Sequence, residues 1–158
     1  MESGKYRLNI GVCNANDVCR KAISTVGHRC PAGVKMYMTT DVPDTYVFQS
    51  DPKRVEQVVM NYLTNAVKHT VEGEIHVHVS LTENKGMLTF SVTDTGEGVP
   101  ADKAEVIFGR FEKFNTIKGG TGLGLAICRT IATQLGGEAK LDLTHQGKGA
   151  RFIFTHPV

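Results

Sequence analysis

The chain has 158 residues, of which 41% are hydrophobic and 22% charged, the composition of one soluble globular domain. Its formal net charge of +2 comes from acidic and basic side chains mixed along the chain, so it has no basic stripe of the kind that binds nucleic acid. No apolar stretch approaches the roughly 20 residues needed to cross a bilayer, and residues 1–8 lack the apolar region of a signal peptide. We therefore expect a cytoplasmic domain that contacts neither nucleic acid nor membrane. The four cysteines form no CxxC pair, which favours reduced thiols over a zinc site or a redox motif.

Periodicity predicts a mixed series of strands and helices. Apolar residues alternate with polar ones in the strands and recur every three or four positions in the helices, and glycine, proline and asparagine mark the turns. In chain order we expect a strand at 6–13, a helix at 14–26, strands at 34–40 and 46–50 joined through a turn at 41–44, a helix at 52–69, strands at 74–81 and 87–93, a short helix at 101–108, a helix at 123–135, and strands at 138–143 and 150–155. The segment 96–121 holds no regular period for long, and a loop of this length usually has a function.

Three polar residues share one face of the predicted helix at 52–69. Asn61, Asn65 and Lys68 are separated by four and three residues, so their side chains can converge on one ligand. An amide oxygen is a ligand that Mg²⁺ accepts beside water and phosphate oxygens, and a lysine one turn further can meet a phosphate charge. Taken alone, the same spacing also suits the exposed polar face of an amphipathic helix.

Asp94 ends a predicted strand and is followed by Gly96 and Gly98 in the segment DTGEG. A carboxylate there can accept a hydrogen bond from the exocyclic amine of adenine, where guanine carries a carbonyl, and would select ATP over GTP. The glycines would let a flat ring lie against bare backbone. A turn with ordinary Asx and glycine chemistry is the alternative interpretation of this motif.

Glycines cluster again at the start of the predicted helix at 123–135. The segment reads Gly119, Gly120, Thr121, Gly122, Leu123, Gly124 and Leu125. Backbone N–H groups at a helix start have no partners within the helix, and the helix dipole favours an anion there. The cluster therefore predicts a triphosphate site, because a flexible hinge would need fewer glycines.

Upstream of this cluster, phenylalanines recur at intervals of three at Phe108, Phe111 and Phe114, with Arg110 and Lys113 between them. The aromatic side chains suit either a lid pinned to the body of the domain or an ordinary core, and the spacing does not decide between them. The two cations can reach the oxygens of β- and γ-phosphates.

Together these motifs resemble the catalytic and ATP-binding domain of two-component sensor histidine kinases, within the GHKL superfamily of ATPases that includes gyrase. NYLTNAVKHT from Asn61 resembles the N box, DTGEG from Asp94 the first glycine box, IFGRF from Ile107 the F box, and GGTGLGLAI from Gly119 the second glycine box. The motifs occur in the family's order and cover most of residues 51–131. One departure is Ala150, where the family commonly has threonine near adenine, so a water-mediated contact is expected to be lost.

The resemblance implies the Bergerat fold: a two-layer α/β sandwich whose mixed, mostly antiparallel sheet is covered on one face by about three helices, with a long ATP lid. It implies ATP and Mg²⁺ as cofactors, with Asn65 as the main magnesium ligand and Asn61 as a possible second one. Catalytic roles are implied for Asn61, Lys68, Arg110 and Lys113. Nucleotide contacts are implied for Asn65, Lys68, His69, Asp94, Gly96, Gly98, Val99, Phe108, Gly120, Thr121, Gly122, Leu123, Gly124 and Leu125.

The implied reaction is transfer of the γ-phosphoryl group of Mg-ATP to a histidine on a separate dimerisation and phosphotransfer domain of the same full-length kinase, with a response-regulator receiver domain as a further partner. None of the six histidines stands in the helical His-Glu-Leu context that such kinases phosphorylate. Because ESGKYRL resembles the segment that closes the dimerisation helices, we expect residues 1–8 to be its remnant and 9–158 to be the catalytic domain. The fragment is expected to be a monomer by itself, cut from the cytoplasmic part of a larger sensor.

Two other classes of function remain as alternatives, a serine kinase and a non-catalytic nucleotide-binding module, whereas the sequence disfavours an ATP hydrolase and a dinucleotide-binding site. An ATP hydrolase of this superfamily has a glutamate one turn before the magnesium asparagine; here that residue is Asn61, and Glu56 lies on the opposite side of the helix. A serine kinase related to anti-sigma factors shares most of the motifs, and a nucleotide-binding module without catalysis would keep the fold alone. A dinucleotide site at Gly96 and Gly98 lacks the acidic ribose partner on a second parallel strand.

Overall fold

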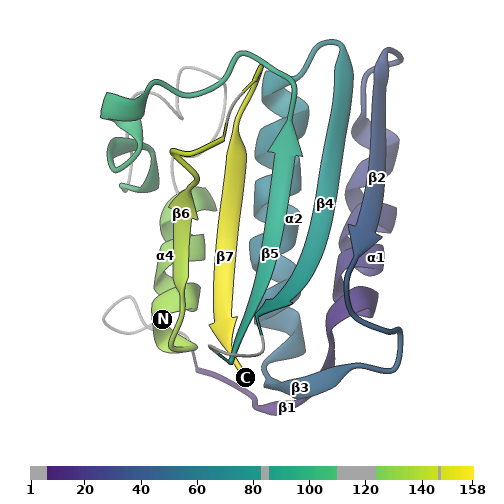
Figure 1. The fold of residues 1–158 in the computed structure, drawn as a ribbon, viewed down its shortest axis with the longest axis vertical. Coiled ribbons are helices and arrows are strands. Elements are labelled where there is room, and N and C mark those ends of the chain that lie inside the picture. The colour runs from purple at the N-terminus through teal and green to yellow at the C-terminus, as the bar shows by residue number, and fades with distance from the viewer. Residues whose placement is uncertain (1–6, 83–85, 110–123, 146) are drawn as a thin grey trace.

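The computed structural model describes residues 7–82, 86–109, 124–145 and 147–158, and its elements form two layers (Figure 1). One layer is a five-stranded sheet with the strand order β2-β4-β5-β7-β6. Its strands are β2 (Val34–Thr40), β4 (Gly73–Thr82), β5 (Met87–Asp94), β6 (Glu138–Leu141) and β7 (Arg151–Pro157). The β2–β4 pair is parallel and the other three pairs are antiparallel.

The second layer consists of helices α1 (Ala15–Val26), α2 (Pro52–His69) and α4 (Gly124–Gln134), which cover one face of the sheet (Figure 1). A short 3₁₀ helix, η1 (Gly27–Arg29), extends α1. The start of α2 follows from its sequence, because the Asp51 carboxylate accepts hydrogen bonds from the N–H groups of Lys53 and Arg54 while Pro52 takes the first helical position. The predicted fold class, a mostly antiparallel sheet under about three helices, is confirmed. Residues 110–121 of the predicted lid segment 96–121 lie outside the described residues.

The core lies between these layers because side chains alternate along each strand. On β5 the residues Leu88, Phe90 and Val92 are buried against the helices, whereas the residues between them point to the other face of the sheet. The largest fully buried side chain belongs to Tyr62 of α2, and its hydroxyl donates to the Ile153 carbonyl of β7 at 2.7 Å. This contact joins the two layers and satisfies the polar end of a buried tyrosine.

Strands β1 (Gly11–Asn14) and β3 (Val47–Ser50) form a separate two-stranded antiparallel sheet at the end of the molecule opposite the carboxyl end of β5 (Figure 1). The strand predicted at 6–13 is therefore shorter and begins later, because the strand begins only where Gly11 meets its partner Ser50. The strand predicted at 46–50 exists, but the chain after β2 leaves the large sheet instead of turning back along it.

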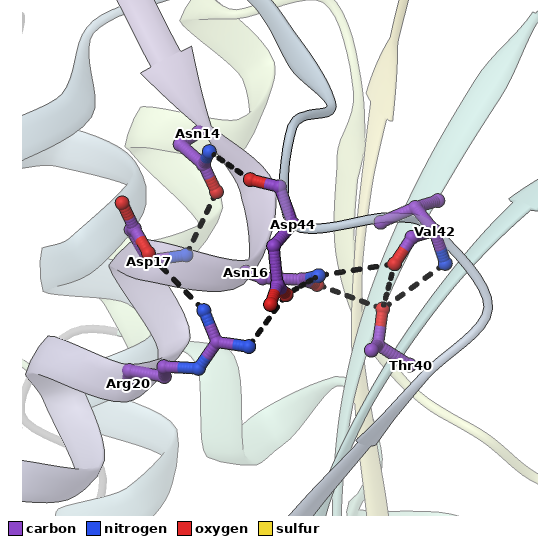
Figure 2. A network of polar contacts seen from close by, with 7 residues as sticks. All are labelled: Asn14, Asn16, Asp17, Arg20, Thr40, Val42 and Asp44. Carbon is purple, nitrogen blue, oxygen red and sulfur yellow. Dashed lines mark hydrogen bonds and ion pairs between the residues drawn. The ribbon is translucent and has the colours of Figure 1, made fainter.

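A polar network explains why the chain leaves the sheet after β2 (Figure 2). Asn16, in the first turn of α1, is completely buried. Its amide nitrogen donates to the Val42 carbonyl at 3.0 Å and to Asp44 at 2.9 Å, while its amide oxygen accepts from the Thr40 hydroxyl at 2.7 Å. Arg20, one turn later, reaches the same Asp44 carboxylate at 2.6 Å. The segment that follows β2 is thus attached to α1, where it satisfies a buried amide that would otherwise cost stability.

The helix predicted at 101–108 is instead a pair of short 3₁₀ helices, η3 (Ala101–Lys103) and η4 (Val106–Phe108). Their N–H groups bond three residues back, as from Ala104 to the Ala101 carbonyl at 3.2 Å and from Gly109 to the Val106 carbonyl at 2.9 Å. Consecutive residues Ile107 and Phe108 are both buried. This segment therefore packs two neighbouring side chains into the core, which suits a short tight turn rather than a longer helix with one apolar stripe.

All four cysteines lie within the described residues and none forms a disulfide, as predicted. Burial raises the pKa of the Cys13, Cys19 and Cys128 thiols to about 12, so these thiols are unreactive at neutral pH. In the part of the chain that the structure describes, no helix is both long and apolar enough to cross a membrane.

Candidate functional site

Asp94 is the last residue of β5 and carries a buried carboxyl group, with 2% of the residue exposed. The N–H of Gly96 donates to its Oδ1 atom at 2.9 Å, and its own N–H donates to the Ala150 carbonyl at 2.9 Å. Burial raises the pKa of the Asp94 carboxyl above its ordinary value. A ligand that donates a hydrogen bond to this group would offset part of the cost of burying its charge.

The turn after Asp94 packs against the carboxyl end of α2. The N–H of Glu97 donates to the His69 carbonyl at 3.4 Å, and the Glu97 carboxylate lies 2.6 Å from Nδ1 of His69. A Cβ atom on Gly96 would overlap that same His69 carbonyl oxygen. Glycine at position 96 is therefore required for the close approach of the turn to the helix.

A second pair of glycines brings another loop against Asp94. Gly98 has φ +78° and Gly149 has φ +89°, and both values favour glycine. A Cβ atom on Gly149 would overlap the Asp94 carbonyl oxygen, and one on Gly98 would lie 3.1 Å from the Gly149 carbonyl oxygen. Ala150, the departure from the family motif, follows directly and is buried. The loop before β7 therefore belongs to the same end of the molecule as Asp94.

The polar face of α2 runs from the start of α4 to the turn after Asp94. At one end, the Asn61 amide nitrogen donates to the carbonyl of Gly124, the first residue of α4, at 3.1 Å. At the other end, His69 holds Glu97. Asn65 and Lys68 lie between these two contacts on the same helix, Asn65 partly buried and Lys68 exposed. Helix α2 therefore contacts the start of α4 near its middle, through Asn61, and the turn after Asp94 at its end, through His69.

Two predicted nucleotide contacts, Phe108 and Leu125, are core residues, 3% and 4% exposed. The ring of Phe108 lies 6.0 Å from that of Phe152, and the Arg129 guanidinium lies over it at 4.6 Å. Arg129 also forms an ion pair with Glu105 at 3.0 Å. Of the two interpretations of Phe108, the core is therefore the one observed, while its contact with a nucleotide stays a prediction. Val99 is partly buried and packs against the same core.

Arg129 was not predicted as a site residue, and it attaches η4 to α4. Its only sequence signal is a cation one turn after Leu125 in an otherwise apolar stretch of helix. The remaining predicted residues fall outside the described ranges: Arg110, Lys113, Gly120, Thr121, Gly122 and Leu123.

The donor set fits magnesium better than a transition metal. Among the described residues, no group of three His, Cys, Asp or Glu side chains is placed to hold a metal ion. Mg²⁺ needs no such group, because it is commonly held by one or two protein oxygens together with phosphate oxygens and water. The amide of Asn65, on the polar face of α2, can supply one of these oxygens.

Known proteins resemble this chain in sequence and in fold. The protein family described as histidine kinase-, DNA gyrase B-, and HSP90-like ATPase matches residues 50–158. The chain is 39% identical over 129 residues to the adaptive-response sensory kinase SasA of Thermosynechococcus vestitus, covering 78% of this chain and 33% of that protein. It is 34% identical over 128 residues to the aerobic respiration control sensor protein ArcB of Escherichia coli, covering 78% of this chain and 16% of that protein.

A solved structure of full-length ShkA in complex with AMPPNP superimposes with a TM-score of 0.83 and 28% sequence identity, covering 96% of this chain and 32% of that one. The chain therefore spans a third or less of each of these three proteins.

Proposed function

Since the chain belongs to the family of histidine kinase-, DNA gyrase B- and HSP90-like ATPases, we propose that it is the ATP-binding catalytic domain of a sensor histidine kinase. In the proposed reaction it transfers the γ-phosphoryl group of Mg-ATP to a histidine on another domain. The observation that carries the proposal is that α2 contacts both other motifs: its end packs against the turn after Asp94, and its middle contacts the start of α4. A relative with 28% identity, ShkA, has been solved with AMPPNP, which supports a nucleotide as the ligand here.

In the proposed complex, Asp94 accepts a hydrogen bond from the adenine amine, with Gly96, Gly98, Val99 and His69 around the ring. The buried Asp94 carboxylate supports this assignment, because burial makes it a strong acceptor for a matched donor.

The polar face of α2 would then hold the phosphates and the metal. Asn65, with Asn61 as a possible second ligand, would bind Mg²⁺, which when bound neutralises phosphate charge. Lys68, Arg110 and Lys113 would contact the phosphoryl oxygens. The segment from Gly120 to Leu125 would cradle the triphosphate by its backbone N–H groups.

Phosphoryl transfer rather than hydrolysis is supported by the side chain at position 61. The Asn61 amide nitrogen donates to the Gly124 carbonyl at 3.1 Å, and an amide is too weak a base to activate water. Catalysis would then depend on holding the γ-phosphoryl group in line with an imidazole nucleophile.

The acceptor histidine, on this proposal, belongs to a dimerisation and phosphotransfer domain of the same longer kinase, and a receiver domain takes the phosphoryl group next. Residues 1–8 would be the remnant of the segment after the dimerisation helices, and 9–158 the catalytic domain in the cytoplasmic part of a sensor. The curated relatives are sensor proteins several times longer than this chain, which supports a multidomain parent.

The test is a phosphotransfer assay with γ-labelled ATP and Mg²⁺. The chain is incubated with a separately produced dimerisation domain bearing the acceptor histidine, with a serine-bearing anti-sigma partner, or with neither. We expect acid-labile, alkali-stable label on the first acceptor only, lost in Asn65→Ala and kept in Glu56→Gln, a change on the opposite side of the same helix. Rapid phosphate release without an acceptor, or acid-stable label on the serine partner, would refute the assignment.

A further inference from the structure

The face of the sheet that carries no helix has a polar hollow of about 380 Å³ that extends across β2, β4, β5 and β7. Its walls are formed by side chains that point away from the core on these strands. At its β2–β4 side lie Thr39, His76 and His78. The helices and the nucleotide motifs of α2 lie on the opposite side of the sheet (Figure 1), so this hollow is separate from the candidate nucleotide site.

His76 and His78 point to the same side of β4 because they are two residues apart in a strand. The parallel register places Thr39 of β2 directly opposite His78. The Thr39 hydroxyl oxygen lies 2.5 Å from Nε2 of His76 and 2.6 Å from Nδ1 of His78. One ring nitrogen of each histidine is therefore directed at a single point between the two strands.

A second contact fixes the orientation of each imidazole ring. Nε2 of His78, the nitrogen that points away from Thr39, lies 3.3 Å from the Asp41 carboxylate. The ring of His76 is stacked on Tyr37, with 4.6 Å between ring centroids and 8° between planes. A carboxylate on the outer nitrogen of a histidine is the arrangement that fixes the tautomer and ring orientation of a metal ligand.

Neutral imidazoles are needed for metal binding, and the surroundings favour them at His76. Partial burial, followed by the neighbouring His78, lowers the pKa of His76 below its ordinary value. A neutral ring offers a free electron pair on the nitrogen that carries no proton, and imidazole nitrogen is a good ligand for Cu²⁺, Ni²⁺ and Zn²⁺.

We propose that Nε2 of His76 and Nδ1 of His78 form a two-histidine site for a divalent transition metal ion, with Asp41 orienting His78 from behind. The ion takes the place of the hydrogen bonds to the Thr39 hydroxyl. Because no third His, Cys, Asp or Glu side chain completes a ligand set among the described residues, water fills the other positions. The site is therefore open, selects copper most strongly by the general order of affinity for nitrogen ligands, and does not bind Mg²⁺.

The experiment is titration of the nucleotide-free chain with Cu²⁺ alone, followed by calorimetry and by the nitrogen hyperfine pattern in electron paramagnetic resonance. We expect one equivalent to bind with two nitrogen ligands. His76→Thr and His78→Thr should each weaken binding at least tenfold, while threonine keeps the strand because it suits the sheet. Asp41→Asn should weaken it by about tenfold, the usual effect of losing such a supporting group.

The matched control is His28→Thr, which removes an exposed histidine from η1. It should leave the stoichiometry and affinity for Cu²⁺ unchanged, and circular dichroism of every variant checks that it is folded. Equal binding by folded His76→Thr and His78→Thr chains, or equal loss in His28→Thr, would overturn the proposal and leave an adventitious ion only. The ATP affinity of His76→Thr and His78→Thr should equal that of the parent chain. Failure of the metal-site proposal would therefore not bear on the proposed nucleotide site.

Discussion

The proposed role of Asp94 in binding adenine can be tested by a single substitution. Asp94→Asn keeps the shape and the Oδ1 acceptor for the Gly96 N–H but removes the charged acceptor proposed for adenine. A hydrogen bond to a charged group contributes about 1.5–3 kcal/mol, so the Kd for ATP should rise about 10- to 100-fold, measured by calorimetry. Asp102→Asn, an exposed change on η3, is the control and should bind ATP like the parent. Unchanged ATP affinity in Asp94→Asn would remove adenine from this pocket.

His156 gives the domain a pH-dependent stability. It is 3% exposed, and its Nε2 lies 2.8 Å from the Ser50 hydroxyl while its Nδ1 lies 2.7 Å from the Pro157 carbonyl. The carbonyl can only accept, so Nδ1 carries the proton and Nε2 accepts from the serine. Burial lowers the pKa of His156 below its ordinary value of 6.5. The neutral ring is therefore the form that the folded state prefers.

The sign of the effect follows from this lowered pKa. The contribution of neutral His156 is complete above pH 6.5 and is lost as the pH falls through 6.5 toward the folded pKa. The free energy of unfolding, measured by urea titration, should thus fall between pH 7.5 and 5, and less steeply in His156→Gln. His28→Gln should show the same change in the free energy of unfolding with pH as the parent chain. The pH dependence that remains in His156→Gln is expected to come partly from His76, whose pKa is also lowered. A His156→Gln slope as steep as that of the parent would contradict the explanation.

Among the elements, the loop that leads into β7 depends on Gly149. Gly149→Ala would place a Cβ atom onto the Asp94 carbonyl at φ +89°, whereas Gly147→Ala at φ +104° meets nothing within 4 Å. Both changes carry backbone strain of about 1–3 kcal/mol, and only the first adds a collision with backbone. We expect Gly149→Ala to lower the free energy of unfolding clearly more than Gly147→Ala, by urea titration. Equal losses would mean that the close approach to Asp94 does not contribute.

The elements that could be predicted from the sequence are those whose ends are determined locally. Asp51 and Pro52 begin α2, and Asn14 caps α1 by accepting the Asp17 N–H at 3.0 Å. The pairing of β1 with β3 was not predictable, because it depends on the attachment of residues 42–44 to Asn16 across the fold. Hydrophobic periodicity predicts one helix in place of the two 3₁₀ helices, because it does not show that two neighbouring side chains are both buried in the core.

In the candidate site, too, local sequence patterns predict one part and contacts between distant residues determine the rest. Its residues could be named from short motifs, since each motif is a local pattern around Asn61, Asp94 or Gly124. The contacts between these residues could not be predicted from the sequence, because the hydrogen bond from Asn61 to Gly124 joins residues 63 positions apart. The same holds for Arg129 and Glu105, whose ion pair spans 24 positions and has no pattern in the sequence.

For the whole molecule, the two faces of the sheet should respond very differently to substitution. Phe90 is 1% exposed and lies in the core, 5.6 Å from the ring of Phe154, while its neighbour Thr89 lines the helix-free face. Phe90→Ala should cost about 3–5 kcal/mol, because it removes a buried ring and leaves a cavity. Thr89→Ala should cost less than about 1 kcal/mol. Denaturant unfolding of both variants checks this, and comparable losses would argue against a single core beneath the helices.

The parallel pairing of β2 with β4 has a consequence for the order in which the chain folds. Parallel strands need a long crossover, here through β3 and α2, whereas β4 and β5 are neighbours along the chain. Pairing of distant segments has to overcome more loop-closure entropy and forms more slowly. During refolding, pulse labelling with deuterium should therefore find the amides of β4 and β5 protected before those of β2, so that this outer strand completes the sheet.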